Sequence, residues 1–270
     1  MKSKYLYIPI SNFQVSSELT LENAKILKSD NAPDEIKDPI SKQGKFYVEI
    51  QNINNEVPRR VLDQVLTVFK LFKDDLVYAT EVFFEGNRDH LPHYVHWIER
   101  SREYREYTLD ESEVENFQKH WIKYINIPHD IFCIQRFHLA DFLAYSRDRY
   151  CSYVEAMEYL LAPDSSEGEI SFKFRFRGTS LLGRNQSESQ RKEIYNLLKQ
   201  AYNLRSSIIH GNLKNVDKAS KKNKDWESIT NPVRNSCRQL IKIFADEDCL
   251  DSKEKRTEFL LKNTILKPDF

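Results

Sequence analysis

The chain has 270 residues, of which 40% are hydrophobic and 12% aromatic, so it can bury a core in one large or two smaller domains. Only 6 residues are glycine and 30% are charged, a composition that favours helices over a glycine-rich sandwich or dinucleotide-binding fold. No apolar run reaches about 18 residues and the N-terminal one is short, so we expect neither a transmembrane helix nor a signal peptide.

The distribution of charge and cysteine narrows the classes of ligand and location. Lys and Arg together number 41, as do Asp and Glu, but residues 171–225 contain 13 Lys and Arg against 4 Asp and Glu. This basic segment favours an anionic ligand. The cysteines form no CxxC pair, so we expect free thiols and a cytoplasmic location. They are Cys133, Cys151, Cys237 and Cys249.

The first 105 residues predict a small α/β unit. Valine and phenylalanine recur at helical spacing after Pro58 and predict a helix over 59–73. The polar stretch 29–45 is expected to be a loop. Runs of β-branched and aromatic residues predict strands at 5–8, 45–50, 76–85 and 93–100, with a turn at 86–89 between the last two.

Three histidines in this region have regular spacing but do not predict a metal site. His90, His93 and His96 lie in a strand-like context, where His93 and His96 would point to opposite faces. No cysteine or carboxylate is placed to complete four ligands. Phosphate-binding, zinc-protease and serine-hydrolase motifs are absent from the sequence. We therefore expect no metal and no cofactor.

From Thr108 onward the apolar residues recur mostly at helical spacing. Helices are predicted at 108–127, 130–146, 150–161, 188–210, 233–244 and 252–266. Residues 170–182 alternate Phe with Lys or Arg and fit a strand as well as a helix. Residues 212–231 are polar and are expected to form a loop. The predicted fold class is α+β, with an α/β unit over 1–105 and an all-α bundle over 106–270.

The long predicted helix ends with Arg205, His210 and Gly211. Gly211 fits a left-handed C-cap, because glycine adopts that conformation without strain. The arginine can bind phosphate and the histidine can transfer a proton near neutral pH. Five residues at 100° each leave the two side chains about 140° apart, so they converge on one ligand only in a cleft. Alternatively, His210 only stabilises the helix C-terminus through the macrodipole.

Three elements in order resemble the Apea-like branch of the HEPN superfamily over residues 130–212. They are Met157-Glu158-Tyr159-Leu160, the R-x-x-x-L-L run from Arg177 to Leu182, and the run from Tyr202 through Arg205-Ser206 to His210-Gly211, which contains the family's R-x4-6-H motif. The resemblance implies that residues 170–182 are helical. It also implies a helical bundle that pairs as a homodimer and cleaves RNA without a metal ion.

The resemblance further implies roles for individual residues. His210 would act as general base or acid in the attack of a 2′-hydroxyl on the adjacent phosphate, and Arg205 would stabilise the phosphate charge. Ser206 and Tyr202 would support the site. Arg177 and Glu158 would form a buried structural pair. Basic residues of the segment, Arg184 and Arg191, would contact the RNA backbone.

The biological role implied is that of a toxin or an anti-phage defence protein, with an antitoxin or a defence-system partner and no membrane. Two alternatives stay open. The bundle could be a non-catalytic module that binds RNA, nucleotide or protein, or a structural dimerisation domain for the N-terminal unit.

Overall fold

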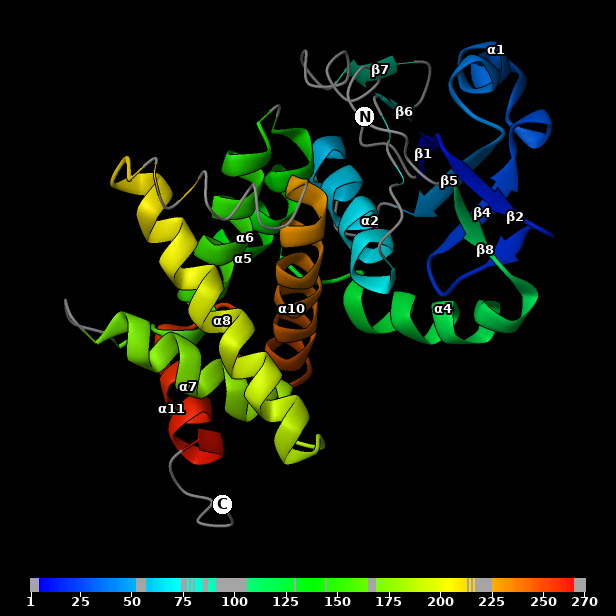
Figure 1. The fold of residues 1–270 in the computed structure, drawn as a ribbon. Helices are drawn as coiled ribbons and strands as arrows, with labels where there is room; N and C mark the ends of the chain where they lie inside the picture. The colour runs from blue at the N-terminus through cyan, green and yellow to red at the C-terminus, as the bar shows by residue number, and fades with distance from the viewer. Residues whose placement is uncertain are drawn as a thin grey trace. The chain divides into compact units, whose positions relative to one another are not determined.

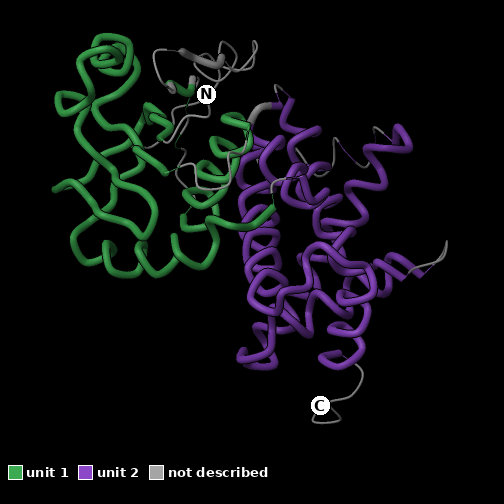
Figure 2. Tube along the Cα trace, turned by 180° about the vertical axis from the view of Figure 1, so that it is seen from behind, with its two compact units in different colours: residues 1–129 green, residues 130–270 purple. Residues whose placement is uncertain are grey.

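A computed structural model describes the chain at residues 5–51, 57–73, 77, 79, 81–84, 87–90, 106–128, 130–143, 145–164, 169–212, 214, 216 and 225–264. The fold is mixed α+β, as predicted, and its strands belong to the N-terminal half (Figure 1). Two compact units divide the chain, residues 1–129 and 130–270 (Figure 2). No helix in the described part is long and apolar enough to span a bilayer.

The N-terminal unit is built on an antiparallel sheet with the order β3-β4-β5-β1-β6-β7. Its strands are β1 (Tyr5–Ile10), β3 (Leu19–Thr20), β4 (Ala24–Lys28), β5 (Phe46–Gln51), β6 (Glu81–Phe84) and β7 (Asn87–His90). Strand β1 pairs with β5 along its whole length, from Tyr5 opposite Gln51 to Ile10 opposite Phe46. Leu6, Ile8 and Ile10 are buried, so this pair forms the centre of the sheet.

The expected loop over 29–45 is wrong. A 3-10 turn, η1 (Ser29–Asn31), precedes helix α1 (Asp34–Gln43). Ile36 and Ile40 lie one helical turn apart and are buried in one cluster with Tyr47 of the sheet. Helix α1 is thus stabilised by burial of a short apolar stripe, although Pro39 lies inside it.

The two strands predicted on either side of a turn at 86–89 also differ in the structure. Residues 87–90, expected mostly as a turn, form β7, with Asn87 opposite Phe84 of β6. Two residues therefore connect the strands, the shortest common hairpin connection. The predicted strand 93–100, with His93 and His96, lies outside the described residues.

Aromatic side chains pack helices α2 (Pro58–Phe72) and α4 (Glu111–Tyr124) of this unit against its short parallel strand pair. The strands are β2 (Phe13–Val15) and β8 (Tyr107–Leu109). The Phe69 ring contacts the rings of four other residues, with centroids 5.2–6.3 Å apart: Phe13, Tyr107, Phe117 and Trp121.

Helix α4 was predicted to begin the C-terminal bundle at residue 106, but it belongs to the N-terminal compact unit, where it packs on α2. The unit boundary therefore falls at 129/130 instead of 105/106. Its N-cap is Asp110, which forms a capping box with Glu113, so the helix begins at Glu111 instead of the predicted residue 108.

The C-terminal unit is all helical in its described part. It contains α5 (Phe132–Leu139), η2 (Ala140–Phe142), α6 (Ser146–Leu161), α7 (Ile170–Leu182), α8 (Glu188–Ile209), α10 (Trp226–Asp246) and α11 (Lys253–Thr264). Helix α6 packs against α5, α7, α8 and α10, so it is the central helix of the bundle. All four cysteines of the chain are buried thiols.

The ambiguous segment 170–182 is helix α7. Phe174, Gly178 and Leu181 are buried at helical spacing, whereas Phe172 and Phe176 are exposed. The Phe alternation therefore does not report a strand, because only one of the three rings enters the core.

Three helix boundaries in this unit were predicted wrongly. The helix expected over 130–146 ends in η2, and α6 begins at Ser146. Helix α10 begins at Trp226, well before the predicted start at 233, because the Asp225 carboxylate accepts a hydrogen bond from the Ser228 amide at 2.6 Å.

Candidate functional site

Helix α8 carries the predicted site, and both of its ends are capped. At its start, Ser187 and Gln190 form a capping box, with Ser187 Oγ accepting from the Gln190 amide at 3.3 Å. At its end, Gly211 has φ +66. The Gly211 amide donates to the Ile208 carbonyl at 3.1 Å and the Asn212 amide to the Ser207 carbonyl at 2.8 Å. This Schellman arrangement fixes the chain direction immediately after His210.

Arg205 is held by two carboxylates of α6. Its Nη2 lies 3.2 Å from Glu158 Oε2 and 4.0 Å from Glu155 Oε1. All three side chains are largely buried, with 18–24% of their area exposed. The Arg205 Nε is buried and makes no hydrogen bond to any described residue. Glu155 also contacts Arg136 Nε at 3.2 Å, so it bridges two arginines.

The surroundings of Glu158 disfavour its charged form. Burial raises the pKa of the Glu158 carboxyl, the neighbouring Glu155 adds to the rise, and Arg205 opposes both. The carboxylates therefore orient the guanidinium at a cost in desolvation.

His210 lies at the other side of the helix end and is exposed. Ser206, one turn earlier, is partly exposed, and its carbonyl accepts the His210 amide at 3.0 Å. Arg205 is turned toward α6, so the two side chains do not meet within one chain. The roughly 140° separation on one helix predicts this arrangement.

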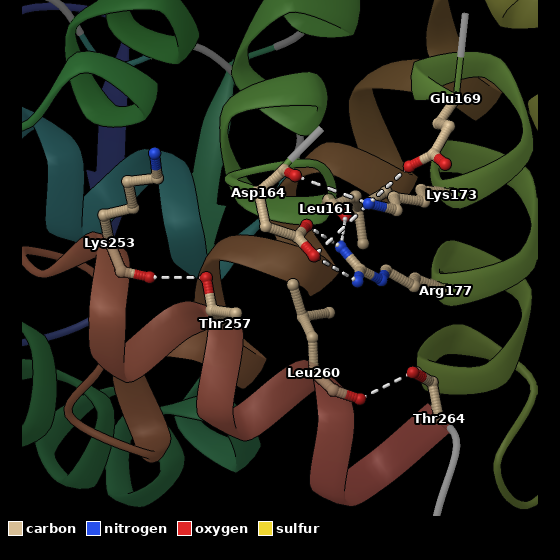
Figure 3. Close-up of polar contacts among 9 residues, drawn as sticks. All are labelled: Leu161, Asp164, Glu169, Lys173, Arg177, Lys253, Thr257, Leu260 and Thr264. Atoms are coloured by element: carbon tan, nitrogen blue, oxygen red, sulfur yellow. Dashed lines mark hydrogen bonds and ion pairs between the residues drawn. The ribbon is translucent and has the colours of Figure 1, made fainter. Parts of the chain in front are cut away.

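The predicted pair between Arg177 and Glu158 is wrong. Arg177, which is 4% exposed, instead binds Asp164 in a bidentate pair, with Nη1–Oδ1 at 2.5 Å and Nη2–Oδ2 at 3.0 Å (Figure 3). Its Nη1 also donates to the Leu161 carbonyl at 3.0 Å, and Lys173 lies 3.3 Å from Asp164. These contacts bind Asp164, in the segment that follows α6, to two basic side chains of α7. The Arg177 guanidinium holds the pKa of the Asp164 carboxyl well below its usual range.

Tyr202, another predicted site residue, lies about one helical turn before Arg205 on α8. Tyr202 is partly buried and packs on Phe174 of α7, with ring centroids 5.7 Å apart. Its position supports the packing of α8 on α7.

The two arginines expected to contact RNA lie near the start of α8. Arg184 is exposed and lines a cleft of about 440 Å³ with residues of α11 and the segment before it. Arg191 packs against Gly183, since a Cβ added at Gly183 would lie 2.7 Å from the Arg191 Cγ. Arg191 precedes Arg205 by about 21 Å of helix, so neither arginine is placed at the Arg205–His210 end.

Sequence reasoning missed the two carboxylates that define this region, Glu155 and Asp164. The sequence could have predicted Glu155, since it lies three residues before Glu158 and therefore shares its helix face. Asp164 had none, because its pairing depends on how the chain turns after α6.

No family of known proteins, no curated protein and no solved structure matches this chain. In the described part of the chain, no three His, Cys, Asp or Glu side chains cluster in a way that would hold a metal ion.

Proposed function

We propose that the chain is a metal-independent endoribonuclease that acts as a cytoplasmic homodimer. The observation that carries this proposal is the end of α8. An exposed histidine immediately precedes a left-handed glycine cap, and an arginine five residues before that histidine is oriented by Glu158 and Glu155. A titratable imidazole and a fixed cation are the two groups that phosphodiester transfer needs when no metal takes part.

In the proposed reaction, the ribose 2′-oxygen attacks the adjacent phosphorus and the 5′-oxygen leaves. His210 accepts the 2′-hydroxyl proton or donates a proton to the leaving oxygen, and Arg205 stabilises the phosphoryl oxygens. The products are a 2′,3′-cyclic phosphate and a 5′-hydroxyl. Since Arg205 and His210 diverge on one helix, two copies of α8 facing each other would bring one arginine and one histidine to the same phosphate.

The carboxylates on Arg205 fit this role. Arginine carries five N–H donors, so a guanidinium held through Nη2 keeps donors for a phosphate. Ser206, on the same turn as Arg205 and partly exposed, is placed to position substrate or the imidazole.

The test is cleavage of a labelled RNA in EDTA by wild type, Arg205→Ala and His210→Ala. Loss of general acid–base catalysis should lower the rate about a hundredfold or more in His210→Ala, and Arg205→Ala should lose at least as much. The exposed Lys253→Ala on α11 serves as the matched control and should cleave like wild type. Cleavage that persists in both site variants would contradict the proposal.

A second candidate is a non-catalytic module that binds RNA, nucleotide or protein. The neutralisation of Arg205 by two carboxylates favours it, because a phosphate must then compete with them. This candidate predicts binding without turnover, weakened by Arg205→Ala and unchanged by His210→Ala.

We assign the nuclease a toxin or anti-phage role on the resemblance to HEPN proteins alone. Expression of wild type should then slow bacterial growth, whereas His210→Ala should not. A co-expressed antitoxin or defence-system partner would relieve the growth defect.

A further inference from the structure

Two phenylalanine rings on α7 face solvent. Phe172 is 61% exposed and Phe176 is 37% exposed. The rings are stacked, with centroids 5.6 Å apart and planes 9° apart. The inward face of α7 is formed by other residues, so the described core does not use these rings. They form a flat apolar surface of a kind that a planar ligand can extend.

A second exposed aromatic ring, on α8, lies under a cation of α7. The Arg175 guanidinium lies over the Tyr195 ring, with Cζ 5.8 Å from the centroid, and Tyr195 is 38% exposed. Arg175 Nε donates to the Ser171 carbonyl at 2.8 Å. No carboxylate among the described residues pairs with Arg175. Arg175, adjacent to Phe176 in the chain, therefore places a positive charge over the exposed Tyr195 ring.

A polar stripe without carboxylates runs along the solvent face of α8. Its residues recur at spacings of three and four, so they share one side of the helix over about 27 Å. They are Lys192, Asn196, Lys199, Asn203, Ser206 and His210, all exposed except the partly exposed Ser206. Tyr195 lies beside Lys192 and Lys199 on this helix. Residues 170–209 contain eight Lys and Arg and two Glu, so the surface carries excess positive charge.

We propose that this surface binds single-stranded RNA. Unpaired bases stack on Phe172, Phe176 and Tyr195, while Lys192 and Lys199 contact the phosphates and direct the strand toward His210. Aromatic faces beside a basic track are the usual means of binding single strands, because every base has a face to stack and a duplex hides it. The proposal deepens the nuclease function by naming the form of its substrate, but the surface itself rests on the contacts above.

The choice of nucleic acid over a protein partner follows from the charges. A protein face covering the phenylalanines would leave Arg175, Lys192 and Lys199 to be matched by carboxylates of the partner. A nucleic acid supplies both the planar groups and a phosphate at every residue. The rings and the cations are then used by one ligand.

Binding is measured with the full-length His210→Ala chain, which keeps the RNA intact if the nuclease proposal holds. The probe is a fluorescent oligouridylate of about ten nucleotides, and the anisotropy is compared with that of a duplex RNA of equal length. Added Phe172→Ala or Phe176→Ala should weaken binding of the single strand about tenfold, and Phe172→Tyr should retain it. Leu261→Ala, on α11 and 40% exposed, is the matched control and should bind normally. Added Lys192→Ala or Lys199→Ala should each reduce the salt dependence of log K by about 0.7.

Equal binding of the single strand by the Phe172→Ala and parental chains would overturn the proposal. The proposal would also be overturned if the two ring substitutions weakened binding of the duplex as much as binding of the single strand. A loss of dimer in sedimentation, without loss of RNA binding, would assign the rings to an interface between copies and also overturn it. Because the rings are exposed, thermal melts of the variants should match that of the parent. Ring-sensitive binding with no cleavage by wild type would leave this surface standing and refute the nuclease. Cleavage by wild type, together with RNA binding that does not depend on the rings, would support the nuclease and refute this RNA-binding surface.

Discussion

Arg205 and Glu158, separated by 47 positions in the sequence, form an ion pair with Nη2 and Oε2 3.2 Å apart. The pair joins α8 to the central helix α6, so the arginine of the candidate site is positioned by the core of its own unit. The same contact makes the stability of the unit depend on the protonation of a largely buried carboxyl.

Glu158→Gln should change the pH dependence of stability. Burial raises the Glu158 pKa above its ordinary value, Glu155 adds to the rise and Arg205 opposes it. As pH rises through this window the unfolded chain loses the proton first, so the contribution of Glu158 to stability falls. Glutamine has no such decline. The free energy of unfolding of wild type, relative to Glu158→Gln, should therefore be higher at pH 4 than at pH 7.

Urea unfolding at both pH values measures this difference. Glu193→Gln on the exposed face of α8 is the control and should leave the pH dependence unchanged. A wild type that gains stability relative to Glu158→Gln as pH rises would show that Arg205 outweighs burial.

Asp164→Asn should destabilise the C-terminal unit at neutral pH by about 3 kcal/mol, because it leaves the buried Arg177 charge without its bidentate partner. Hydrogen bonding from Arg177 lowers the Asp164 pKa, so the carboxylate contributes stability above its ordinary pKa. That contribution is lost as pH falls through the lowered value. The gap between wild type and variant should therefore narrow in acid.

The control for this prediction removes the same charge at an exposed site. Asp248 pairs with Lys255 at 3.0 Å but its side chain is 94% exposed, so Asp248→Asn should be near neutral in urea unfolding. Equal effects of the two substitutions would show that the Arg177 pair contributes no more than a surface pair.

Gly178→Ala should destabilise the bundle although alanine is the better helix former. An added Cβ would lie 2.7 Å from Leu198 Cδ1 and 3.1 Å from Leu161 Cδ1, so these leucine side chains of α8 and α6 would have to move in a packed core. Overpacking costs about 1–3 kcal/mol, against a propensity gain of about 1 kcal/mol. We expect a net loss of about 1 kcal/mol by urea unfolding, and a gain for Asn196→Ala on the exposed face of α8. A Gly178→Ala variant more stable than wild type would show that the side chains of Leu161 and Leu198 move aside at little energetic cost.

The predictability of each helix followed the number of apolar residues that it buries. Helix α2 buries a broad apolar stripe and was predicted within a residue at each end. Helix α1 buries only Ile36 and Ile40 and contains Pro39, so its sequence is indistinguishable from a polar loop. In α7 the two exposed rings, Phe172 and Phe176, create the alternation of a strand although one ring alone is buried.

The candidate site was predictable only where it depends on local geometry. The glycine cap and the divergence of Arg205 from His210 follow from helix parameters. The carboxylate partners do not, because they depend on how α6 packs against α7 and α8. Arg177 and Arg205 both lie near acidic residues of this region, and the family resemblance implied a pair between Glu158 and Arg177. In the structure, Glu158 forms an ion pair with Arg205, and Asp164 forms one with Arg177.

Gly211→Ala should lower stability by about 1 kcal/mol through the backbone alone. Nothing lies within 4 Å of an added Cβ, so no contact is lost or overpacked, whereas φ +66 is strained for an L side chain. Asparagine tolerates this conformation better, so Gly211→Asn should cost less than Gly211→Ala. Urea unfolding gives the order, and hydrogen exchange of the Asn212 amide, which donates to the Ser207 carbonyl, reports fraying of the cap. Faster exchange of the Asn212 amide in Gly211→Ala, together with slower RNA cleavage, would show that the cap orients His210. If the Ala and Asn variants matched wild type in both amide exchange and cleavage, the left-handed turn would be dispensable.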